Sequence, residues 1–91
     1  MTIRTDDLEA FATAARGGTL VAAARALGVS KSVLTRRIAR LEAALGGAVF
    51  LRSTRGLRVT ALGRRVLRHA ERLSREMDSL LADAQAATHE V

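Results

Sequence analysis

The sequence of 91 residues contains no cysteine, proline, tryptophan or tyrosine. Without cysteine there is no disulfide framework, no thiolate nucleophile and no cysteine zinc site. A chain without cysteine also fits a reducing compartment, and we expect a cytoplasmic protein. The first seven residues lack the apolar segment of a signal peptide. No apolar run approaches the ~18 residues of a membrane span, so we expect no membrane partner.

The usual arrangements of catalytic and metal-binding residues are also missing. His69 and His89 are far apart and have no paired carboxylates at ligand spacing, so the sequence indicates no metal site. Ser30 and Ser32 have no histidine and aspartate arranged beside them, so a role as nucleophile is not indicated. There is no glycine-rich phosphate loop. We therefore predict neither an enzyme nor a cofactor.

Charge is distributed very unevenly. The chain carries 15 Lys and Arg against 9 Asp and Glu, a formal net charge of +6, and all of these cations except Lys31 are arginine. Residues 1–30 are neutral overall, residues 31–75 are strongly basic, and residues 76–91 are acidic. A basic middle indicates an anionic partner there, and arginine suits phosphates and base edges. A solvated helix face rich in arginine is the alternative.

Apolar residues spaced i, i+3, i+4 and i+7 predict three short helices before residue 47. Thr5, Thr19 and Ser30 are predicted to cap them, because a hydroxyl oxygen can accept a hydrogen bond from the first helical turn. Glycines follow each helix, as expected of helix ends. The three helices should bury one small core made of Leu8, Phe11, Ala12 and Ala15, then Leu20, Ala23, Ala24 and Leu27, then Leu34, Ile38, Leu41 and Leu45.

Residues 49–59 predict two short strands around the basic turn 52–56. An isolated hairpin is only marginally stable in water, so we expect it to pack on the helices through Phe50 and Leu57. From Thr60 to about Ala87 a helical pattern returns. Its apolar residues alternate in steps of four and three, a heptad pattern that predicts dimerisation. We assign dimerisation to Val66, Ala70, Leu73, Met77, Leu80 and Ala84.

The segment 20–38, two helices joined by a turn at Gly28, matches a helix-turn-helix. The face of the second helix opposite its apolar side carries hydroxyls, small groups and arginines near its start. Such groups can bind base edges in a DNA major groove. The candidates begin at Ser30 and include Ser32 and Arg36, flanked by Val33, Thr35 and Arg40. An ordinary bundle helix with a polar face is the alternative.

Several motifs in this order resemble the DNA-binding region of the LysR-type transcriptional regulators. They are Leu8-Glu9-Ala10-Phe11, Gly18-Thr19-Leu20, Ala22-Ala23-Ala24, Leu27-Gly28-Val29-Ser30, Leu34-Thr35-Arg36-Arg37-Ile38, Leu41-Glu42, Leu45-Gly46, Val49-Phe50-Leu51-Arg52 and Thr60-Ala61-Leu62-Gly63. The resemblance covers nearly the whole chain. In that family a larger effector-binding domain follows the linker helix, and these 91 residues do not contain it.

The resemblance implies a mainly α fold: a winged helix-turn-helix over 1–60 and a long linker and dimerisation helix over 61–91. The recognition helix would span about 31–45 and the wing 49–59. The residues that read bases would be Lys31, Ser32, Val33, Thr35 and Arg36. Thr19 would contact a phosphate, and Arg52 and Arg55 would contact the backbone or the minor groove.

Two functions remain open from the sequence. The first is sequence-specific binding of double-stranded DNA by a homodimer, on an interrupted palindromic site that mirrors the two-fold axis. The second is a basic helical dimerisation or interaction module that binds nucleic acid or acidic partners without sequence preference. The heptad pattern fits both functions. The face from Ser30 to Arg36 and the basic hairpin favour the first.

Overall fold

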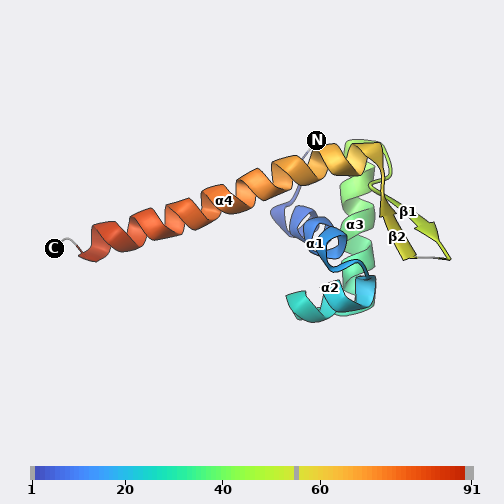
Figure 1. The fold of residues 1–91 in the computed structure, drawn as a ribbon, viewed down its shortest axis with the longest axis horizontal. Helices are drawn as coiled ribbons and strands as arrows, with labels where there is room; N and C mark the ends of the chain where they lie inside the picture. The colour runs from blue at the N-terminus through green and yellow to red at the C-terminus, as the bar shows by residue number, and fades with distance from the viewer. Residues whose placement is uncertain (1, 55, 90–91) are drawn as a thin grey trace.

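The computed structural model describes residues 2–54 and 56–89. Their elements, in chain order, are α1 (Thr5–Gly17), α2 (Leu20–Leu27), α3 (Lys31–Leu45), β1 (Phe50–Ser53), β2 (Gly56–Val59) and α4 (Ala61–His89). The first three helices and the hairpin gather at one end, and α4 extends away from them, so that the molecule measures 56 × 27 × 20 Å (Figure 1). None of the helices in the described part of the chain is long and apolar enough to cross a membrane.

Two of the three predicted helix caps are present. Thr19 Oγ1 accepts a hydrogen bond from the Ala22 N–H, and Ser30 Oγ accepts one from the Val33 N–H, both at 3.1 Å. The predicted Thr5 cap is wrong, because Thr5 is already the first residue of α1. The helix begins one residue earlier than expected since the Arg4 carbonyl accepts the Leu8 N–H at 3.1 Å, and the Arg4 side chain makes no capping bond.

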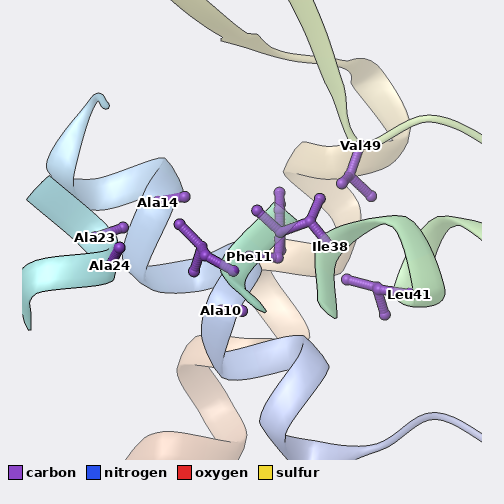
Figure 2. Packing of buried hydrophobic residues seen from close by; sticks show 9 residues of the cluster. Ala10, Phe11, Ala14, Ala23, Ala24, Ile38, Leu41 and Val49 are labelled. Carbon is purple, nitrogen blue, oxygen red and sulfur yellow. The ribbon is translucent and has the colours of Figure 1, made fainter. Parts of the chain in front are cut away.

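The core lies where α1, α2, α3 and the start of the hairpin meet (Figure 2). Phe11 of α1 is fully buried at its centre, and small alanines on α1 and α2 let these helices approach closely. The Phe11 ring packs against Phe50 of β1 with centroids 5.1 Å apart and planes tilted by 55°, a favourable aromatic geometry. The hairpin is therefore anchored on the helices through Phe50, as predicted, and also through Val59. Leu57, the other predicted anchor, is half-buried and lines a small cavity with Leu20 and Ile38.

Polar side chains hold the base of the hairpin between α3 and α4. Glu42 of α3 accepts the Val49 N–H at 2.8 Å. The Thr60 hydroxyl donates to the Ala48 carbonyl at 2.7 Å and accepts the Gly63 N–H at 2.9 Å, which also caps α4. These bonds satisfy backbone groups at the base of the antiparallel pair, where Phe50 lies opposite Val59.

The first turn of α4 contacts the hairpin base so closely that residue 63 must be small. A Cβ on Gly63 would collide with the Val49 carbonyl oxygen and lie 2.7 Å from Val59 Cγ1. We expect Gly63→Ala to lower the free energy of unfolding by about 1–3 kcal/mol, because overpacking outweighs the better helix propensity of alanine. Urea unfolding of both proteins at one fixed protein concentration measures this change in the free energy of unfolding.

Gly17→Ala is the matched control for that substitution. A Cβ on Gly17 would meet the Ala22 Cβ at 3.9 Å, an ordinary contact. We expect the stability of this variant to equal or exceed that of the wild type. If the Gly63→Ala protein were as stable as Gly17→Ala, the hairpin base would be able to shift and accommodate the added methyl group without cost.

The heptad residues of α4 divide into two groups, one packed on the chain's own core and one exposed. Val66 packs against the core, and Ala70 is buried. By contrast Leu73, Met77 and Leu80 are 51%, 63% and 67% exposed. Val66 and Ala70 therefore attach α4 to its own core, and the exposed apolar surface begins at Leu73. The division of the chain at residue 60 stays a prediction.

Candidate nucleic-acid interface

The helix-turn-helix is closed by local hydrogen bonds. Gly28 ends α2 in the left-handed conformation, with φ 68°, and the Val29 N–H returns to the Ala24 carbonyl at 3.0 Å. Ser30 then caps α3 directly. These bonds define the path from α2 to α3, and they place the first turn of α3 toward the turn end of the hairpin.

The outer face of α3 is open and bears hydrogen-bonding side chains. Its shallow surface is lined by Lys31, Ser32, Thr35, Arg36 and Ala39. Thr35 is half-buried, whereas the other four are exposed. Val33 is half-buried and lies outside this lining, beside the buried Leu34. We call these five lining residues the α3 outer face.

A groove of about 330 Å³ joins three separate elements next to the α3 outer face. It brings Thr19 from the start of α2, Lys31 from α3 and Arg52 from β1 to one side of the molecule. Each of these three residues is predicted separately from the sequence, and the fold brings them together. Arg55, the other predicted contact of the hairpin, lies outside the described residues.

Val21, an apolar residue in the same groove, was not among the site residues predicted from the sequence. Val21 of α2 is 55% exposed and lines the groove. The signal was present, because Val21 falls outside the spacing of Leu20, Ala23, Ala24 and Leu27 that faces the core. Its methyl groups add to the apolar part of the groove, which Leu20 and Leu57 also line beside Lys31 and Arg52.

The structure gives Arg40 a different partner from the one predicted. Its Nε and Nη2 donate to the two carboxylate oxygens of Asp7 at 2.7 and 2.8 Å. Asp7, at the start of α1, is 1% exposed. The hydrogen bond to Asp7 is the main cause that raises the pKa of Arg40 above its ordinary value, against a lowering by desolvation. With this bidentate pair formed, we leave Arg40 out of the residues proposed to contact DNA.

The site is therefore a basic surface with hydroxyl groups, formed by exposed residues of α3 and β1 and by the start of α2. Within residues 2–54 and 56–89, no three histidine, cysteine, aspartate or glutamate side chains gather where they could hold a metal ion. Guanidinium, ammonium and hydroxyl groups in such an arrangement can bind phosphate oxygens and base edges.

Comparison with known proteins decides the family. Residues 5–64 match the family described as bacterial regulatory helix-turn-helix protein, lysR family. The chain belongs to the lysR family. The match includes the helix-turn-helix, the hairpin and the beginning of α4. It confirms the expected family and the winged helix-turn-helix fold, and it assigns the chain to regulatory proteins rather than to enzymes.

Individual relatives agree with this assignment. The small neutral protease regulatory protein of Streptomyces coelicolor is 41% identical over 87 residues, which cover 96% of this chain and 26% of the relative. A crystal structure described as a CbnR DBD–DNA complex superposes with a TM-score of 0.83 at 34% identity, covering 93% of this chain and 98% of the other. Oxidised OxyR of Corynebacterium glutamicum superposes with a TM-score of 0.89 at 29% identity, covering 99% and 28%.

Proposed function

We propose that this chain is a DNA-binding domain that recognises a sequence in double-stranded DNA as a homodimer and serves a bacterial transcriptional regulator. The observation that carries the proposal is the gathering of Lys31, Arg36, Arg52 and Thr19, from three elements, on one open side of the molecule. The similar CbnR domain was crystallised with DNA. Because bacterial DNA lies in the cytoplasm, that is the compartment in which we propose it works.

Each element has its own task in this proposal. The start of α3 enters the major groove, where Lys31, Ser32, Thr35 and Arg36 contact base edges. Thr19 and Arg52 contact phosphates on either side and fix the orientation of α3. The capped N-termini of α2 and α3 carry partial positive charge and favour nearby phosphates. Ser30 and Val33 stay in the contact region as predictions, with Ser30 also needed as a cap.

The exposed apolar residues of α4 support the homodimer. Leu73, Met77, Leu80 and Leu81 are all more than half exposed. Leu73 and Met77 also line a groove of about 610 Å³ between α4 and α1, together with Leu8 and Ala12. The groove is also lined by Asp6, Glu9, Arg16 and Asp78, so it combines apolar and charged side chains. An exposed apolar stripe beside such a groove is typical of an interface, and we assign both to the α4 of a second copy. Ala84 lies at the far end of the same stripe.

Charge complementarity supports an antiparallel pair of α4 helices. The first half of α4 carries Arg64, Arg65, Arg68, Arg72 and Arg75 with one acid, Glu71, whereas the described second half carries Glu76, Asp78 and Asp83. An antiparallel arrangement places basic halves beside acidic halves, and a parallel one places like charges together. An antiparallel pair of identical helices has a two-fold axis. The two recognition helices related by this axis would bind the two halves of an interrupted palindrome.

Selection of preferred sites from random duplex, followed by competition, tests the proposed function. We expect an interrupted palindrome to emerge, and binding to it to survive excess random duplex. Random duplex should compete equally well if the chain is a module that binds nucleic acid without sequence preference. Basic charge alone would produce that second result, so it would refute sequence recognition.

Thr19 allows the phosphate contact to be separated from the helix cap. Thr19→Ala should lose about 1 kcal/mol of stability with the cap. Thr19→Asp keeps an oxygen that can cap α2 but puts a negative charge where we place a phosphate, so it should retain stability and weaken binding to every duplex. Thermal unfolding and binding to random duplex measure the two effects. Unchanged random-duplex affinity of Thr19→Asp would remove Thr19 from the DNA-contacting residues.

A further inference from the structure

Asp7 and Arg40 join the start of α1 to the recognition helix at a position close to the α3 outer face. Arg40 lies one turn after Arg36 and only about 40° around the helix from it. Instead of projecting outward as Arg36 does, the Arg40 side chain turns toward α1 and meets both Asp7 oxygens. The pair therefore holds the flank of α3 that faces away from the hairpin.

The apolar contacts of α3 and this ion pair constrain the helix differently. Leu34, Ile38 and Leu41 are buried and attach α3 to the core, but hydrophobic burial by itself has no preferred direction. A bidentate guanidinium–carboxylate pair needs two parallel hydrogen bonds in one plane. Asp7 is buried in α1 and therefore held in place. The pair with Arg40 thus restrains the rotation of α3 about its own axis.

Stability alone does not explain such a pair. A desolvated carboxylate with an arginine is often no more stabilising than apolar residues of the same volume, and geometric specificity is one reason why such a pair is retained. We propose that Asp7 and Arg40 are positioning residues for DNA recognition: they set the rotation of α3 so that Arg36 and Ser32 meet base edges. This proposal rests on the proposed function above.

Asp7→Asn provides a test, because a pure charge effect and the positioning role predict opposite changes in affinity for the selected site. The substitution removes a negative charge, so electrostatics alone should tighten binding to every duplex. Release of Arg40 toward DNA would tighten it further. Positioning predicts that binding to the selected site weakens, so that the ratio of selected-site to random-duplex affinity falls by about tenfold, within the range that one base contact contributes. Glu71→Gln removes the same charge on the side of α4 opposite Leu73 and Met77, and it should leave this ratio near the wild-type value.

Arg40→Lys is the second variant, because it keeps the charge and loses the planar pair of donors. It should lower the ratio of selected-site to random-duplex affinity by a similar factor, while random-duplex affinity stays constant. The double variant Asp7→Asn/Arg40→Lys should lower this ratio no more than either single variant does, because both substitutions break the same pair. Partial unfolding lowers the active concentration equally for both duplexes and leaves the ratio unchanged. An unchanged ratio in both variants would therefore assign the pair to stability alone and overturn the positioning role. A wild-type chain with no preference at all would overturn the proposed function and this inference together.

Discussion

Glutamate at residues 73 and 77 is expected to convert the dimer into a monomer. In Leu73→Glu/Met77→Glu, four new carboxylates would lie within the proposed interface of each dimer, where charge cannot be buried without partners. Both residues are exposed in the single chain, so the fold of each protomer should persist. Sedimentation at micromolar concentration should show the mass of one chain. Affinity for the full palindrome should fall by about 10²–10⁴-fold, because the second half-site is no longer held at high effective concentration.

Ser79→Glu/Ala82→Glu is the charge-matched control for this prediction. Both residues are exposed and lie on the side of α4 opposite Leu73 and Met77, about 150° around the helix. The control adds the same negative charge and should remain a dimer. Its loss of duplex affinity therefore measures the effect of charge alone. If wild type itself sediments as a monomer, or if the two double variants bind the palindrome equally, the α4 stripe is not the dimer interface.

Local patterns were sufficient to predict the elements of this fold. Thr19 and Ser30 each precede a segment with the apolar spacing of a helix, and a glycine follows each segment. The start, the body and the end of these helices are therefore each determined by a few neighbouring residues. Phe50 could be identified as the anchor of the hairpin because a two-stranded hairpin needs apolar support. The candidate residues on α3 followed from the same periodicity, since the side opposite Leu34 and Ile38 must face outward.

Contacts between residues distant in sequence were not predictable in this way. Asp7 and Arg40 are 33 positions apart, and each has a plausible local explanation: Asp7 near a helix N-terminus and Arg40 on a basic face. Ala70 continues a heptad pattern that extends to Leu73, yet it is buried because α4 crosses α1 at that point. Periodicity gives the face on which a residue lies, but the neighbouring element decides what covers that face.

Arg36→Ala is expected to cause the largest loss of sequence discrimination among the basic residues of α3. Arg36 is exposed on the α3 outer face and close to the helix start, where side chains reach base edges. One bidentate arginine–base pair contributes about 1–3 kcal/mol of discrimination, and a dimer forms this pair twice, so the loss on the full site should be about 2–6 kcal/mol. Alanine is a strong helix former, so stability should not fall.

Arg52→Ala removes the same charge from the hairpin and separates base reading from phosphate binding. If Arg52 binds a phosphate, its removal should weaken selected and random duplex alike and reduce the log–log salt slope by about 0.9 for each phosphate that is no longer neutralised. Arg36→Ala should instead act mainly on the selected site and relax the preference at one position of each half-site. Salt titrations of wild type and both variants on the two duplexes measure these effects. Equal losses on both duplexes for Arg36→Ala would place Arg36 with the phosphate-binding residues, and base reading would then fall to Lys31, Ser32 and Thr35.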